Sequence, residues 1–196
     1  MKGLDVVVRL VCRTCNEGWM SRLEVAFRQI ATGLLTGQGM PIILSKDDQL
    51  IVARWAAKTA YMLERGTAFA TRGITVPPGH LKHLLDPGFP AFEVSVALGA
   101  VDAKGTLISW LKPTAFFDGA VQIGYEIAFS VGYALFSVWF WDSPRIWKPR
   151  PEIQKRLVDI WPVSGPVAWP PGRPFSEAEI ESIWPPTLEK VDAATT

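Results

Sequence analysis

Residues 121–131 read VQIGYEIAFSV, and this stretch decides the fold class. Its odd positions carry Val, Ile, Tyr, Ile, Phe and Val, whereas its even positions carry smaller or polar residues. A period of two is typical of a β-strand with one buried face and one freer face. Gly132 can turn the chain into ALFSVWFW at 134–141, and β-type runs also occupy 92–101 and 106–112. We therefore expect an antiparallel sheet of about three to five strands.

Two helices are predicted before the sheet. Apolar residues recur at helical spacing from Trp19, and the first helix should end near Gly37. Ser45, with Asp48 three residues later, resembles a capping box and should begin the second helix, for which Gly66 is a C-terminal stop. Because the connection between them is short, the two helices should pack as an antiparallel hairpin.

An irregular tail follows the sheet. Seven of the 16 residues in IWPVSGPVAWPPGRPF, 160–175, are Pro or Gly, which excludes a helix or a central strand. Trp161 and Trp169 are expected to hold this segment against the body of the protein. Ser176 and Glu179 form a second capping box, which predicts a last short helix.

The complete pattern predicts an α+β protein: a short strand at 5–11 with a cysteine knuckle, a helical hairpin, an antiparallel sheet and a Trp/Pro-rich tail. Residues 1–72 should hold the knuckle and hairpin, and residues 73–196 the sheet and tail, within one compact domain. The chain is 48% hydrophobic, which excludes overall disorder. The uncharged stretch 127–141 is too short to span a bilayer, and the N-terminus shows no secretory signal. We expect a cytoplasmic protein without a membrane partner.

Cys12 and Cys15 form a Cys-x2-Cys pair, and the chain has no other cysteine. Such a pair supplies two of the four ligands of a structural zinc site. His80 and His83 are the only histidines and could complete the site, although their spacing is tighter than in typical zinc fingers. Two other interpretations stay open: a redox pair at a helix start, or two reduced thiols that only pack.

The sequence around the cysteines resembles a known family. CRTCNEGWMSRLE at 12–24, LLTGQ at 34–38 and LIVARWAAKTAYMLE at 50–64 are similar to the C-terminal two-thirds of bacterial and phage proteins labelled HNH-endonuclease-like. The resemblance covers residues 6 to about 66 and, more weakly, the Trp-Pro pairs of the tail.

The resemblance implies roles for individual residues. Cys12 and Cys15 would be the family's second zinc knuckle, and Asn16 would be the asparagine that follows it. The helix that packs on the knuckle would begin with Trp19, Met20, Leu23 and Glu24. The spacing of its apolar residues is also what a plain helix core demands.

The chain lacks the family's residues that would carry catalysis. The first knuckle and the family's Glu-His-x-x-Pro segment would precede Met1, and no histidine precedes Cys12. In HNH chemistry a histidine activates the attacking water, and a divalent ion stabilises the phosphoryl transition state. We therefore expect a catalytically incomplete module without nuclease turnover on its own. If His80 and His83 do not complete the zinc site, a second copy could do so in a homodimer, or another protein could donate the missing ligands.

Charge is distributed unevenly along the chain. The net charge is +1, with ten basic and six acidic residues in 1–72, and ten basic and thirteen acidic residues in 73–196. Near the knuckle, the candidate phosphate contacts are Arg9, Arg13, Arg22 and Arg28. They would give weak, salt-sensitive binding to DNA, or they are solubilising charges on a helix.

Nine tryptophans are many for a chain of 196 residues. Trp147, Trp161 and Trp169 are candidate contacts with a protein partner, while core packing is the ordinary alternative. The leading function is a catalytically incomplete HNH-like module associated with nucleic-acid processing in phage or other mobile DNA. The alternative is a non-enzymatic protein-binding module, such as an accessory or inhibitor protein with an anti-defence role in phage–host conflict.

Overall fold

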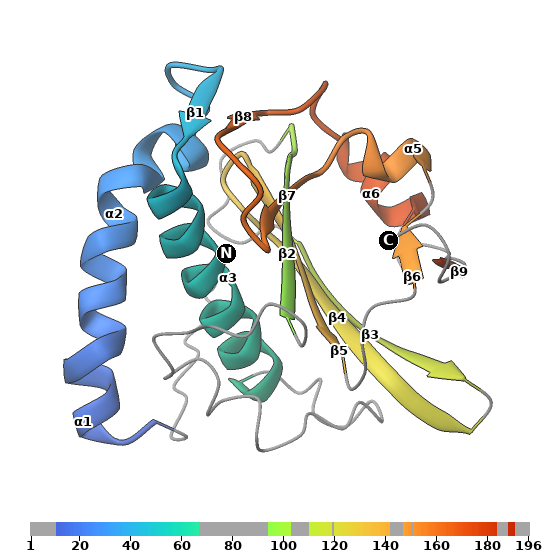
Figure 1. Cartoon of the computed structure of the whole chain (residues 1–196), viewed down its shortest axis with the longest axis horizontal. Helices are drawn as coiled ribbons and strands as arrows, with labels where there is room; N and C mark the ends of the chain where they lie inside the picture. The colour runs from blue at the N-terminus through green and yellow to red at the C-terminus, as the bar shows by residue number, and fades with distance from the viewer. Residues whose placement is uncertain are drawn as a thin grey trace.

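The computed structural model (Figure 1) describes residues 11–66, 94–102, 110–118, 120–141, 147–149, 151–183 and 188–190. Within them, the helices are α1 (Arg13–Cys15), the π-helical turn η1 (Asn16–Met20), α2 (Ser21–Thr36), α3 (Lys46–Gly66), α5 (Pro151–Gln154) and α6 (Glu177–Ile183). The strands are β1 (Ile42–Leu44), β2 (Val94–Ala100), β3 (Trp110–Asp118), β4 (Val121–Val131), β5 (Ala134–Trp141), β6 (Trp147–Pro149), β7 (Val158–Trp161), β8 (Val167–Trp169) and β9 (Leu188–Lys190). The helical hairpin and antiparallel sheets confirm the predicted α+β class. None of the described helices combines the length and apolar character that a membrane span requires.

Helices α2 and α3 form the predicted antiparallel hairpin, which lies against one face of the sheet (Figure 1). Helix α2 ends at Gly37, which has a φ of 69° and donates its N–H to the Gly33 oxygen at 3.0 Å. At the start of α3, the Ser45 hydroxyl accepts the N–H of Asp48 at 3.1 Å, and the Asp48 carboxylate accepts the N–H of Ser45 at 2.9 Å. These reciprocal bonds are the predicted capping box.

The main sheet has five antiparallel strands in the order β3-β4-β5-β2-β7. Strands β4 and β5 have the predicted bounds and are joined by Gly132, whose φ is 56°, and Tyr133. The backbone N–H of Tyr133 donates to the Leu35 oxygen of α2 at 3.0 Å. A Cβ added to Gly132 would lie 2.1 Å from that oxygen. The turn therefore meets the end of α2 at a distance that only glycine allows.

Strand β3 differs from the prediction of a strand at 106–112. It begins at Trp110 and continues to Asp118 through Pro113, and residues 103–109 lie outside the described residues. Proline is tolerated because β3 is an outer strand of the sheet. Most of the predicted strand at 5–11 also lies outside the described residues.

The face of the sheet toward the helices holds the main core. Trp55 of α3 stacks on Phe27 of α2 with ring centroids 3.8 Å apart and an interplanar angle of 8°. The same indole lies 6.3 Å from the ring of Phe129 in β4 and 5.4 Å from the ring of Phe136 in β5. Trp55 therefore joins both helices and two strands in one cluster.

The other face of the sheet is not the freer face that the alternation predicted. Ala128 and Leu135 are fully buried with residues of α5 and α6. Glu126 is also fully buried, and its Oε1 accepts a hydrogen bond from the Ser137 hydroxyl at 2.6 Å. The indole N–H of Trp139 donates to the same hydroxyl at 2.7 Å. The prediction was wrong because the small and polar even-numbered residues of β4 left room for distant segments to cover this face.

The tail returns to the helical hairpin, where β8 pairs antiparallel with β1. Trp169 is fully buried and its indole N–H donates to the Gly99 oxygen at 2.9 Å. The buried amide of Gln49 in α3 donates to the oxygens of Leu44 at 3.0 Å and Gly165 at 2.7 Å. These contacts confirm that Trp169 anchors the tail.

Helix α6 begins with the second predicted capping box. The N–H of Ser176 donates to the Glu179 carboxylate at 2.8 Å, and the N–H of Glu179 donates to the Ser176 hydroxyl at 3.3 Å. Glu179 also pairs with Arg173 and, at 3.1 Å, with Arg156, whose guanidinium lies 3.6 Å from the ring centroid of Phe175. Hydrogen bonds from Arg173 first, and from Arg156 second, hold the pKa of Glu179 well below its ordinary value.

Candidate functional site: a thiol pair and a neighbouring pocket

The two cysteines lie side by side at the start of the first helical turn. Cys12 precedes α1 in an extended conformation, with φ −67° and ψ 154°, and its sulfur accepts the backbone N–H of Cys15 at 3.3 Å. Both are free thiols, and Cys12 is exposed while Cys15 is partly buried. The turn therefore brings two potential thiolate ligands to one point of the surface.

The two thiols differ in acidity. The Cys15 thiol, followed by the Cys15 backbone N–H, donates to Cys12 and lowers the pKa of Cys12. The same contact between the thiols, followed by burial, raises the pKa of Cys15. The indole of Trp19 acts in the opposite direction on the pKa of Cys15, although its buried N–H has no regular hydrogen-bond partner among the described residues. Cys12 is therefore the sulfur that ionises first.

These residues fit half of a zinc site. A structural zinc ion takes four ligands. In the part of the chain that the structure describes, no group of three or more His, Cys, Asp or Glu residues is placed to hold a metal. His80 and His83 lie outside the described residues. Cys12 and Cys15 would occupy two corners of a tetrahedral site, and the remaining ligands would come from outside the described residues.

Three of the four candidate arginines are exposed, Arg13 in α1 and Arg22 and Arg28 in α2, and Arg9 lies outside the described residues. Arg13 pairs with Glu17 at 2.8 Å, but the two side chains are 86% and 61% exposed, so this ion pair is weak. Arg22 and Arg28 lie on the solvent-exposed side of α2, and neither forms an ion pair within the described ranges. All three guanidinium groups are therefore accessible to a phosphate.

The two other residues of the motif have different surroundings. Asn16 is exposed at the first position of η1, directly after the knuckle. Trp19 is partly buried and packs against the main core, as a helix-core residue does. Trp19 therefore has a structural role here, whereas the Asn16 side chain is accessible.

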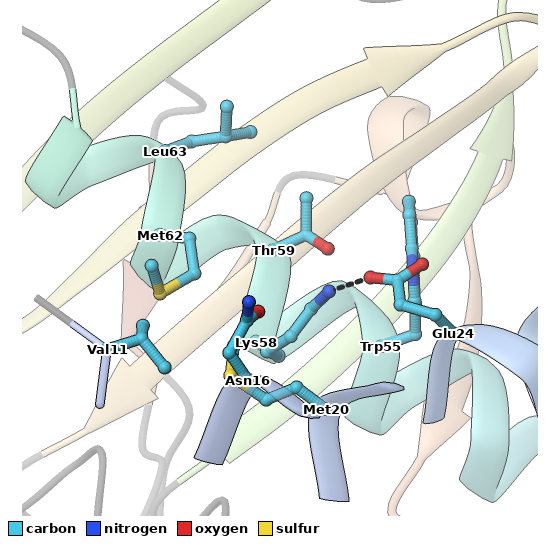
Figure 2. Close-up of a pocket in the computed structure, with 9 residues that line it drawn as sticks. All are labelled: Val11, Asn16, Met20, Glu24, Trp55, Lys58, Thr59, Met62 and Leu63. Atoms are coloured by element: carbon cyan, nitrogen blue, oxygen red, sulfur yellow. Dashed lines mark hydrogen bonds and ion pairs between the residues drawn. The ribbon is translucent and has the colours of Figure 1, made fainter. Parts of the chain in front are cut away.

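A pocket of about 430 Å³ opens between the knuckle and α3. Figure 2 shows that its lining residues come from residue 11, the start of the helical hairpin and the second half of α3. The apolar part of the lining consists of Val11, Met20, Trp55, Met62 and Leu63. The polar part consists of Asn16, Glu24, Lys58 and Thr59. The pocket thus combines apolar walls with a few convergent polar groups, as ligand sites do.

Lys58 contributes a buried positive charge to the pocket. It is only 7% exposed, and its ammonium pairs with one oxygen of Glu24 and lies 5.7 Å from the ring centroid of Trp55 (Figure 2). The other oxygen of Glu24 accepts the indole N–H of Trp55 at 3.0 Å. Buried lysines are rare unless they are paired, so the ion pair explains how this side chain is retained.

The pocket was missed in the sequence, although a signal was present. Lys58 stands three residues after Trp55 and four before Met62, and therefore on the apolar face of a predicted helix. A cation at such a position needs a buried partner, and Glu24 lies in the string that carries the family resemblance. The pairing of Lys58 with Glu24 depends on the packing of two helices, which spacing along one helix does not show.

The candidate tryptophans differ in accessibility. Trp169 is fully buried, which removes its indole from any binding surface of this fold. Trp161 is partly buried and packs against the main core, in agreement with its predicted role in holding the tail. Trp147 lies in β6, opposite Lys190 of β9. The structure thus supports an anchoring role for two of the three residues.

No protein-family model, curated protein or solved structure matches the chain. The similarity of residues 12–64 to HNH-endonuclease-like proteins therefore stays an expectation. The thiol pair, the exposed arginines and the pocket carry the functional conclusion.

Proposed function

We propose that the chain is a zinc-knuckle module of the HNH-like kind that binds nucleic acid and does not cleave it on its own. The arrangement of Cys12 and Cys15 carries the proposal. Both cysteines are free of a disulfide, and the exposed sulfur accepts a backbone N–H at 3.3 Å, a contact that favours a thiolate. The resemblance of the sequence from Cys12 to Glu24 to the family's second knuckle points in the same direction.

Zinc, when bound, would supply a rigid link between two polypeptides. Two copies of the knuckle related by a two-fold axis would provide four thiolates, because an isologous contact brings the same surface to itself. A different protein that donates two ligands would serve equally. In either arrangement the knuckle positions the start of α2 and its arginines relative to the partner chain.

The exposed arginines of α1 and α2 would provide the contacts with phosphates. Arg13, Arg22 and Arg28 are exposed, and guanidinium groups match phosphate oxygens in geometry. The net charge of only +1 gives little long-range attraction to nucleic acid. Binding should therefore be moderate and should weaken strongly as salt concentration rises.

Metal content measured together with molecular mass tests the zinc arrangement. For a shared four-thiolate site, we expect about one zinc ion per two chains and a dimer in solution. The double variant Cys12→Ser/Cys15→Ser should contain no zinc and should be monomeric. A zinc-free monomer of the original chain, purified with zinc supplied throughout, would contradict the shared site.

Retention of the protein on DNA tests the second part of the proposal. The double variant Arg22→Gln/Arg28→Gln should bind more weakly. The slope of log K against log salt concentration should become shallower by about two, because two phosphate contacts are lost. The single variant Lys155→Gln removes one exposed positive charge directly after α5 and serves as the control. Equal binding by the original chain, the double variant and Lys155→Gln would show that these arginines do not contact phosphates.

The second candidate is a non-enzymatic protein-binding module, such as an inhibitor with an anti-defence role. Large apolar side chains exposed on α2 and β1 favour it: Val25 in α2 is 55% exposed and Ile43 in β1 is 64% exposed. This alternative predicts no retention on DNA even at about 50 mM salt, where a phosphate-binding module would be held.

A further inference from the structure

We propose that the pocket beside the knuckle holds an unpaired nucleobase, so that the protein binds single-stranded nucleic acid through a base as well as through phosphates. This inference rests on the proposed nucleic-acid function and deepens it, because it names the chemical group that the pocket takes. It is carried by the hydrogen-bonding groups, the charge and the walls of the pocket.

The polar groups of the pocket mostly offer hydrogen-bond donors. An ammonium has three N–H groups, and the described residues provide Lys58 with one carboxylate partner, Glu24. Both Glu24 oxygens are already engaged, one by Lys58 and the other by the Trp55 indole. The exposed Asn16 amide adds two N–H groups and one oxygen. A ligand that fits should therefore present acceptor atoms, such as carbonyl oxygens and ring nitrogens.

The charge of the pocket favours a neutral ligand. The positive charge of Lys58 is matched by Glu24, so a carboxylate or phosphate entering the pocket would lose water and lie close to an anion. A nucleobase is neutral and carries acceptors at its edge. Lysine contacts of this type are known for the O6 and N7 atoms of guanine.

The shape and location of the pocket agree with this ligand. Val11, Met20 and Met62 form apolar and polarisable walls, against which a flat ring gains dispersion contacts. Trp55 contributes only the 8% of its surface that remains exposed, because its ring already stacks on Phe27. The volume of about 430 Å³ lies within the range of roughly 300–1,000 Å³ that ligand pockets occupy. Asn16 lies one helical turn from Arg13, so a strand with a base in the pocket would pass the exposed arginine.

Two oligonucleotides that differ only in their bases test the proposal. One is a fluorescein-labelled single-stranded DNA of about ten nucleotides, and the other has the same backbone with abasic sites. Fluorescence anisotropy should show that the protein binds the first about tenfold more tightly. Lys58→Met and Asn16→Ala should each reduce this preference to about twofold or less without weakening the binding of the abasic strand. Lys46→Met, at the exposed start of the same helix, is the matched control and should keep the full preference.

The outcomes separate the two proposals. Equal binding of both oligonucleotides, lowered for both by Arg22→Gln/Arg28→Gln, would overturn the base pocket and leave the phosphate-binding function intact. No binding of either oligonucleotide at about 50 mM salt would overturn both. If circular dichroism shows that Lys58→Met does not fold, Asn16→Ala decides, because its side chain is exposed and carries no core packing. A full base preference in Asn16→Ala would then refute the assignment.

Discussion

Replacing Gly132 with alanine should destabilise the protein by about 2–3 kcal/mol, because the turn between β4 and β5 lies in close contact with the end of α2. A residue with a Cβ adopts a left-handed φ such as 56° at a cost of about 1–2 kcal/mol. The new Cβ would lie 2.1 Å from the Leu35 oxygen and 2.9 Å from the Leu35 carbonyl carbon. The backbone must therefore move, which breaks the Tyr133 N–H bond to Leu35 and costs about 1 kcal/mol more.

Urea denaturation followed by tryptophan fluorescence measures this change, and calorimetry should show a fall in Tm of about 4–12 °C for a chain of this size. Gly165→Ala is the matched control, since nothing lies within 4 Å of an added Cβ at that position. The control should change the free energy of unfolding by less than about 0.5 kcal/mol. If Gly132→Ala is as stable as Gly165→Ala, the contact between the turn and α2 is not as close as described.

Three other substitutions test the tail and the tail-facing side of α3. Trp169→Phe should lower the free energy of unfolding by about 1–3 kcal/mol, because it leaves a buried carbonyl oxygen without its indole donor; unchanged urea denaturation would refute the anchoring role. Gln49→Leu removes both donor bonds of a buried amide and should cost about 2 kcal/mol or more by the same measurement, and a neutral or stabilising result would contradict it. The depressed pKa of Glu179 contributes stability that is fully present above its ordinary value of 4.5 and is lost as the pH falls below it. Glu179→Gln should therefore flatten the dependence of Tm on pH in the acid range, whereas Glu177→Gln in the same helix should leave it unchanged; a pH profile like that of the original chain would show that the ion pairs of Glu179 are not formed.

Local signals predicted much of this fold. The capping boxes at Ser45 and Ser176 and the stop at Gly37 depend on residues within four positions of one another, and the alternation in 121–131 lies within one strand. The structure has these elements where they were expected. The pairing of β8 with β1 and of β7 with β2 involves residues far apart in the chain, for which short-range patterns hold no information. Coverage of the second sheet face belongs to the same class of long-range contacts.

The candidate site also combines a part that the sequence predicts with a part that depends on long-range packing. The knuckle is a short-range motif, and the cysteines lie together as the Cys-x2-Cys spacing predicts. The pocket arises from two helices, with Glu24 on one and Lys58 on the other, and its presence depends on how they pack. The position of Lys58 on an apolar helix face predicts a buried lysine that needs a charged partner, but it does not identify Glu24 as that partner.

The pairing of β1 with β8 has a consequence for synthesis on the ribosome. Ile42 pairs with Trp169 in the ladder, and the ribosome adds Trp169 about 6–25 s after Ile42 at usual rates of translation of about 5–20 residues per second. During that interval the nascent hairpin keeps unpaired strand edges and apolar side chains that a chaperone can hold. Premature termination of translation would therefore release an aggregation-prone fragment rather than a smaller folded protein.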